Sequence, residues 1–140
     1  MSDTKNAATL LLVDDDPVNR IAFTRAFKKL KVNYDLVSVE DGIEALDYLN
    51  SQVARHAGAL PSVIVFLDIY MPRMNGLEFC AAVSSNCCLD GVVVYAFATA
   101  DTPDAIRVSL DPRVAGYLTK NNPLETLQST LCANGMPTIQ

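Results

Sequence analysis

Short apolar runs rich in valine, isoleucine and leucine alternate along this chain with longer segments whose apolar residues recur at helical spacing. The runs occupy residues 9–13, 34–39, 62–67, 91–97 and 116–119. Helical spacing is clear near the end of the chain, at Leu124, Leu127 and Leu131. Parallel strands need crossover connections, which are right-handed. The pattern therefore predicts an α/β fold, a doubly wound five-stranded parallel sheet with helices on both faces.

Local signals predict where the helices begin. A capping residue followed by proline occurs three times, at Asp16–Pro17, Thr102–Pro103 and Asn122–Pro123. Glu125 is placed for a capping box with Asn122. Two further helices are predicted to begin after Asp41–Gly42 and at Gly76. We expect the long connection 51–61 to be an extended helix end followed by a surface loop.

The composition narrows the class of protein. The 140 residues are enough for one domain with a hydrophobic core, so we expect a single domain over residues 1–140 with its core at about 8–133. Half of the residues are hydrophobic and 19% are charged, which favours a compact fold. A net charge of −5 disfavours direct binding of nucleic acid. Without a secretion signal or a membrane-length apolar run, we expect the chain in the cytoplasm and not in a membrane.

Two of the predicted strands end in carboxylates. The run 10–13 is followed by Asp14, Asp15 and Asp16, and the run 63–67 is followed by Asp68. Carboxyl ends of parallel strands are where open α/β folds bind ligands, so three or four carboxylates converge if these strands are neighbours. Such a cluster needs protons, a cationic partner or a hard metal ion such as Mg²⁺. The alternative is that the aspartates cap helices and turns, which is the better interpretation for Asp16.

Two other predicted strands are each followed by a residue with a polar side chain, one with a hydroxyl group and one with an amino group. Thr99 follows the fourth strand and Lys120 follows the fifth, on the same rim as the carboxylates. Either residue alone is usually a strand boundary and nothing more. Together with the aspartates they suit phosphoryl transfer, which needs in-line positioning and neutralisation of spreading negative charge.

At this point the chain resembles the receiver domain of two-component response regulators. The residues that carry the resemblance are Leu11–Pro17, Leu67–Gly76, Thr99–Ala100 and Gly116–Lys120. The motifs stand in the family's order and span nearly the whole chain. The resemblance implies a flavodoxin-like sheet with strand order 2-1-3-4-5. It also implies a stand-alone, chemotaxis-regulator-like phosphoacceptor that catalyses its own phosphotransfer and dephosphorylation and is not a conventional enzyme.

The resemblance implies a role for each site residue. Asp68 is the phosphoacceptor, and Mg²⁺ is the cofactor, held by Asp14, Asp15, Asp68 and the backbone carbonyl of Tyr70. The residues that bind the phosphoryl group are Thr99, Ala100 and Lys120. The donor is a histidine kinase or a histidine phosphotransfer protein, and the output is a protein target.

The resemblance also implies a conformational switch. Thr99 and Tyr117 form the switch pair, which reshapes the face made by the fourth helix, the fifth strand and the fifth helix. The same face is a possible surface for a homodimer. Tyr117 has a plain structural interpretation too, as a half-buried strand residue with its hydroxyl in water. Tyr70 and Asp101 occupy the positions that modulate dephosphorylation. Asn121 departs from the family, which usually has a proline there, and a binding module that signals without phosphorylation remains an alternative on that ground.

Five basic residues form a cluster in or just after the first predicted helix. The cluster consists of Arg20, Arg25, Lys28, Lys29 and Lys31. It is either a solvated surface or a docking surface for the phosphoryl donor, and five such spread charges cannot all share one helix face.

The connection 51–61 is similar to that of single-domain regulators associated with bacterial phytochromes. The segment Asp14–Val18 also fits the DxDxV pattern of haloacid-dehalogenase phosphatases, whose nucleophile would be Asp14.

Overall fold

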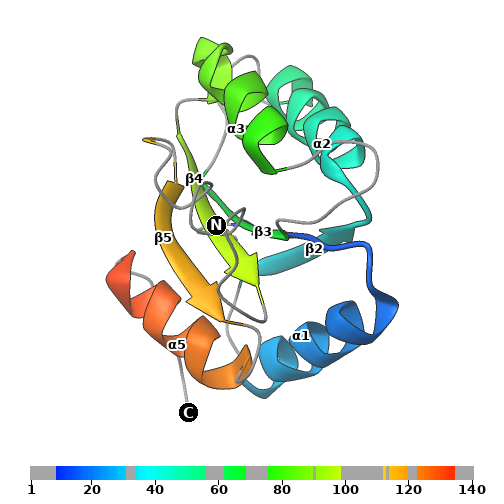
Figure 1. Cartoon of the computed structure of the whole chain (residues 1–140), viewed down its shortest axis with the longest axis vertical. Helices are drawn as coiled ribbons and strands as arrows, with labels where there is room; N and C mark the ends of the chain where they lie inside the picture. Colours follow the sequence, from blue (N-terminus) through cyan, green and yellow to red (C-terminus); the bar gives the residue numbers. More distant parts are fainter. Residues whose placement is uncertain are drawn as a thin grey trace, which may run out of the picture.

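The computed structural model describes residues 9–30, 34–55, 62–68, 76–89, 91–98, 112, 114–119 and 123–134. Its five parallel strands form one sheet in the order β2-β1-β3-β4-β5 (Figure 1). The strands are β1 (Thr9–Val13), β2 (Asp35–Val39), β3 (Val63–Asp68), β4 (Val92–Ala98) and β5 (Val114–Thr119). This topology confirms the predicted doubly wound sheet.

The central strands are apolar on both faces because helices cover both sides of the sheet. All six residues of β3 are buried, and so are the last four residues of β1. The parallel register pairs Val13 of β1 with Leu67 of β3, and Asp68 with Phe97 of β4. The residues that follow β1 and the residue that ends β3 are therefore brought to the same edge of the sheet.

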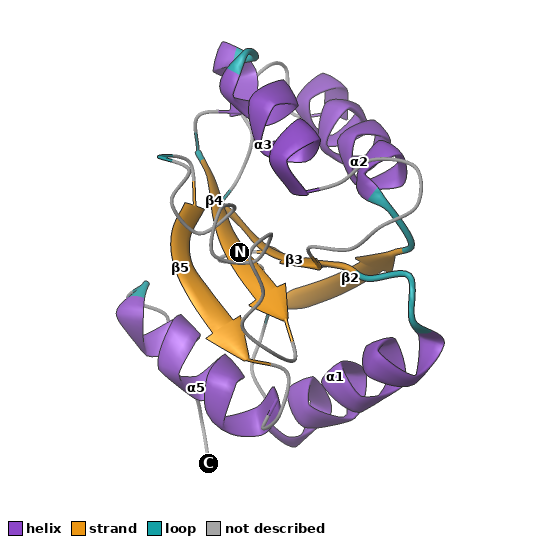
Figure 2. Ribbon diagram, in the orientation of Figure 1, coloured by secondary structure: helices purple, strands orange, loops and turns teal. Residues whose placement is uncertain are grey.

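Four helices and a short 3₁₀ turn are described. The helices are α1 (Pro17–Leu30), α2 (Gly42–Arg55), α3 (Gly76–Ser84) and α5 (Pro123–Ala133), and the turn is Cys87–Leu89. Helices α1 and α5 cover one face of the sheet and pack on each other, while α2 and α3 cover the other face (Figure 2). Each face has its own core, one around Phe23, Phe66 and Leu127, the other around Leu49, Val65 and Phe79.

The structure confirms most of the predicted helix starts. The Asp16 carboxylate accepts a hydrogen bond from the Val18 amide at 2.9 Å, so Asp16 is an N-cap. The Asp41 carboxylate caps α2 by accepting from the Glu44 amide at 2.9 Å, and Glu44 accepts in turn from the Glu40 amide at 2.8 Å. The proposed start at Thr102–Pro103 and the capping residue Asn122 lie outside the described residues.

Two boundaries refine the sequence prediction. Helix α2 runs to Arg55, so the first part of the 51–61 connection is an extended helix end as predicted, and residues 56–61 lie outside the described part. Strand β5 starts at Val114, two residues before the predicted start. Ala115 and Gly116 are weak strand formers that hid this start. Gly116 suits the position, because a Cβ there would lie 3.1 Å from the Tyr95 ring.

The Phe66→Ala substitution should destabilise the protein by about 3 to 5 kcal/mol, because the cavity removes ring contacts as well as buried apolar area. Phe66 is fully buried, with ring centroids 4.9 Å from Phe23 and 6.0 Å from Phe97. Urea unfolding followed by circular dichroism measures the change. Val18→Ala is the control, since Val18 is 70% exposed and its loss should cost less than about 0.5 kcal/mol. Equal midpoints for the two variants would contradict this description of the core.

Candidate functional site

Three carboxylates meet at the carboxyl edge of the sheet. One oxygen each from Asp14, Asp15 and Asp68 lies within 4.8 Å of the others. Asp14 and Asp15 directly follow β1, and Asp68 is the last residue of β3, the neighbouring strand. The structure thus brings together the aspartates that the sequence singled out.

The burial of these side chains is uneven. Asp14 is fully buried and Asp68 is 7% exposed, whereas Asp15 is exposed. Like charges at such distances repel one another, and a bound cation relieves the repulsion. Carboxylate oxygens are the ligands that Mg²⁺ prefers, and the exposed side of the cluster leaves an approach from solvent. The donor set therefore fits a hard divalent cation.

Asp14 is held by its backbone and by its side chain. Its amide donates to the Val39 carbonyl at 3.1 Å, which continues the pairing of β1 with β2. One oxygen of its carboxylate accepts from the Asp16 amide at 2.9 Å. Its carbonyl accepts a 2.7 Å hydrogen bond from the Arg20 guanidinium. The position of this carboxylate is thus set by β2, by the turn into α1 and by α1 itself.

Several residues named from the sequence lie outside the described part of the chain. They are Tyr70, Thr99, Ala100, Asp101, Lys120 and Asn121. The strands that lead to two of them do end at this edge, because Ala98 of β4 pairs with Thr119 of β5 in the parallel register. The roles of Thr99 and Lys120 in the site remain predictions.

Tyr117 is described, and it stands opposite Ala96 in the register of β4 and β5. Its side chain is half-buried, as the plain structural interpretation has it, but its hydroxyl oxygen is buried and does not lie in water. A buried phenol is a sensitive reporter of changes in packing around β5.

Arg20 is the residue whose role sequence reasoning missed. Arg20 belongs to the basic cluster of the first helix, but its side chain is only 21% exposed and binds the Asp14 carbonyl. Its other terminal nitrogen lies 3.9 Å from a carboxylate oxygen of Glu40. The signal available in the sequence was its position, six residues after Asp14 and within the first turns of a helix, whose side chains point back toward the N-terminus.

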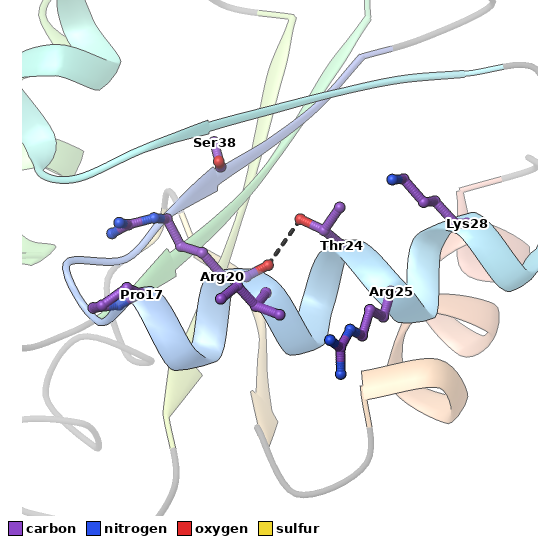
Figure 3. A pocket seen from close by; sticks show the side chains of 7 residues that line it. Pro17, Arg20, Thr24, Arg25, Lys28 and Ser38 are labelled. Atoms are coloured by element: carbon purple, nitrogen blue, oxygen red, sulfur yellow. Dashed lines mark hydrogen bonds between the residues drawn. The ribbon is translucent and has the colours of Figure 1, made fainter.

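The remaining surface of α1 is apolar near the acidic edge and basic farther along. Val18 and Ile21 are exposed large hydrophobic residues, at 70% and 53%. Arg25 and Lys28 are exposed at positions that continue the same helix face. An open groove of about 460 Å³ follows the helix beside β2 (Figure 3), lined by Pro17, Arg20, Ile21, Thr24, Arg25, Lys28 and Ser38. Lys31 lies outside the described residues.

A parallel sheet of order 2-1-3-4-5 with an acidic cluster at its carboxyl edge defines a flavodoxin-like doubly wound α/β fold whose ligand site lies where such folds bind ligands. The sequence profile of the response regulator receiver domain family matches residues 10–131. The chain belongs to this family. Receiver domains take phosphoryl groups from histidine kinases and bind Mg²⁺ or Mn²⁺ at an acidic pocket. The match does not support the phosphatase hypothesis.

Individual relatives agree with the family. Response regulator Rcp1 from Synechocystis is 28% identical over 128 residues, covering 91% of this chain and 86% of Rcp1. A two-component response regulator from Cytophaga hutchinsonii has a TM-score of 0.76 at 25% identity, covering 92% and 96% of the two chains. The phosphorylated cyanobacterial phytochrome response regulator RcpA has a TM-score of 0.70 at 27% identity, covering 90% and 89%. Among the described residues, no helix is long and apolar enough to cross a membrane.

Asp68→Asn should raise the free energy of unfolding in metal-free buffer, since it removes one of three crowded negative charges. At 4.8 Å each pair of charges repels by about 1 kcal/mol at the dielectric constant of water and by about 3.5 kcal/mol at an effective value of about 20, so relief of at least about 1 to 3 kcal/mol is expected. Added Mg²⁺ should stabilise the wild type and have a smaller effect on the variant. Urea unfolding with and without Mg²⁺ measures both effects. A variant less stable than the wild type without metal would show that repulsion does not dominate this cluster.

Proposed function

We propose that this chain is a receiver of the cytoplasm that accepts a phosphoryl group on Asp68 and signals through its partner affinity. The observation that carries the proposal is the approach of three carboxylates within 4.8 Å at the edge where β1 and β3 end. Asp68 belongs to a strand that is buried along its whole length, so its carboxylate is held on a rigid element. The family match supplies the class of chemistry.

In the proposed step, a carboxylate oxygen of Asp68 attacks the phosphorus of a phosphohistidine. The new O–P bond forms as the P–N bond breaks, and the departing imidazole keeps the electron pair and takes up a proton. Asp14, Asp15, Asp68 and the Tyr70 carbonyl would hold Mg²⁺, which would supply charge neutralisation at this edge. Lys120, Thr99 and the backbone of Ala100 stabilise the phosphoryl oxygens.

Loss of the phosphoryl group occurs by hydrolysis within the same site. Tyr70 and Asp101 stand two residues after Asp68 and Thr99, where side chains govern the approach of water. We propose that the ring of Tyr70 hinders water and that the carboxylate of Asp101 orients it.

We propose that the output is a switch of Thr99 and Tyr117 on the face of the fourth helix, β5 and α5. Support comes from Tyr117, which lies in β5 with its hydroxyl oxygen buried, and from α5, which packs beside β5. A new phosphate draws the Thr99 hydroxyl toward it and repacks the Tyr117 ring, a local charge event that tips a two-state element. The changed face binds a protein target or a second copy of the chain.

We propose that the donor docks on α1, next to the acidic edge. Val18, Ile21, Arg25 and Lys28 follow one another at helical spacing on one exposed face. Aliphatic contacts near the site and cations farther away suit a helical partner with an acidic rim. The similarity to RcpA, described as a phytochrome response regulator, supports a phytochrome-linked histidine kinase as this donor.

Wild type incubated with acetyl phosphate and Mg²⁺ should gain the mass of one phosphoryl group, and Asp68→Asn should gain none. Acetyl phosphate removes the need for a kinase, so the result reports the chemistry of the chain alone. Intact mass spectrometry follows the modification, and beryllium fluoride with tyrosine fluorescence reports the conformational response. The chain contains five tyrosines and no tryptophan, so the tyrosine signal is not masked by tryptophan.

The controls separate the alternative functions. Omission of Mg²⁺ should abolish the modification of wild type. A phosphatase with Asp14 as nucleophile would release phosphate and lose its chemistry in Asp14→Asn but keep it in Asp68→Asn. A module that signals without phosphorylation would show no mass change in any variant. Either pattern would overturn the proposal.

Ile21→Glu and Lys28→Glu should each slow phosphotransfer from a histidine kinase that phosphorylates the wild type, by about tenfold. The reason is that each removes a favourable contact and places a negative charge on the docking face. Modification by acetyl phosphate should stay at the wild-type rate. Arg55→Glu is the charge-matched control, because Arg55 ends α2, on the other face of the sheet. An equal loss in Arg55→Glu would point to net charge instead of docking.

A further inference from the structure

Arg20 ties α1 to the loop that carries two of the acidic residues. One terminal nitrogen of its guanidinium donates to the Asp14 carbonyl at 2.7 Å, and its own amide donates to the Asp16 carbonyl at 3.1 Å. The side chain and the backbone of one residue thus hold both ends of the 14–16 turn. We propose that Arg20 is a positioning residue for the metal site, one that sets the metal affinity by fixing Asp14.

The direction of the side chain supports this role. Arg20 is the fourth residue of α1, and helical side chains lean toward the N-terminus of their helix. Figure 3 shows the guanidinium extending over Pro17 toward the loop from β1, whereas the side chain of Arg25 points away from it. Arg20 therefore differs from the exposed basic residues farther along α1, although all belong to one sequence cluster.

Three hydrogen bonds hold Asp14, and each of them holds a different group of this residue. The amide is held by the sheet through Val39, and the carboxylate is oriented by the Asp16 amide. The carbonyl is held by the side chain of Arg20, through a short charge-assisted hydrogen bond. The 14–15 peptide begins at this carbonyl, so its orientation also directs the backbone into Asp15. Groups that orient metal ligands without touching the ion commonly change metal affinity 10- to 100-fold.

The ion pair with Glu40 is the weaker part of the arrangement. The two atoms are 3.9 Å apart, and the Glu40 side chain is 66% exposed, so solvent screens the attraction. The pair nevertheless links α1 to the loop after β2, where the Glu44 carboxylate accepts from the Glu40 amide. The hydrogen bond to Asp14 is the contact on which the proposal depends.

Charge and position have opposite effects on metal binding, which makes the proposal testable. A guanidinium near a cation site repels the cation, so loss of its charge alone would tighten Mg²⁺ binding. Loss of the hydrogen bond to the Asp14 carbonyl loosens the ligand and weakens binding. If Arg20 acts through position, removal of its guanidinium therefore lowers the affinity despite the favourable loss of repulsion.

Arg20→Met keeps most of the aliphatic stem and removes every donor, and we expect it to bind Mg²⁺ about tenfold more weakly than wild type. Arg20→Lys keeps the charge and one possible donor site, and we expect an intermediate affinity. Isothermal titration calorimetry with MgCl₂ measures the affinity at a temperature where every variant is folded. Thermal unfolding without metal is recorded for each variant, so that a general loss of stability is seen separately. Arg55→Met is the matched control and should bind as wild type does.

The outcomes separate this inference from the proposed function, on which it rests. Wild type that binds no Mg²⁺ would overturn both. Wild type that binds Mg²⁺, together with an Arg20→Met variant of equal or tighter affinity, would overturn the positioning role alone. A variant with a lower unfolding temperature but unchanged affinity would likewise show that Arg20 serves the fold and not the site.

Discussion

The mutual repulsion of Asp14, Asp15 and Asp68 is the constraint on which the rest of this structure depends. Three oxygens within 4.8 Å, two of them on nearly inaccessible side chains, form an arrangement that only a well-packed scaffold maintains. The scaffold is the pair β1 and β3, whose residues, apart from Thr9, are buried between two helical layers. The backbone of β3 fixes Asp68, and the turn after β1 holds the buried Asp14 beside it, so a divalent cation is the natural way to relieve the repulsion.

Helix α1 has two functions in this arrangement because its faces differ. The side toward the strands is apolar and packs Phe23 on Phe66 and Phe97. Near its N-terminus, Arg20 reaches back to the Asp14 carbonyl and Asp16 caps the helix, so the start of α1 and the acidic loop form one structural unit. The outer face carries exposed Val18 and Ile21 beside this unit. In the proposed docking mode, a partner on this face lies next to the acidic cluster, so that recognition and chemistry share one edge of the sheet.

Much of the fold and part of the candidate site followed from the sequence. The β-branched runs predicted the strands, and Asp–Pro and Asp–Gly predicted the starts of α1 and α2. The carboxylates that follow β1 and end β3 are recognisable because each comes directly after an uninterrupted apolar run. The start of β5 was missed because Ala115 and Gly116 carry no strand signal, and Gly116 is explained by the Tyr95 ring from another strand.

The sequence by itself determined the class of the protein, its strand order through family resemblance, and the residue types available for chemistry. Local periodicity and capping act between residues that are neighbours in the chain, so they can be read without coordinates. Only the tertiary structure decided that Arg20 holds the Asp14 carbonyl while Arg25 remains exposed, and that the hydroxyl of Tyr117 is buried. These depend on distances between elements, and the packing of helices on the sheet sets those distances.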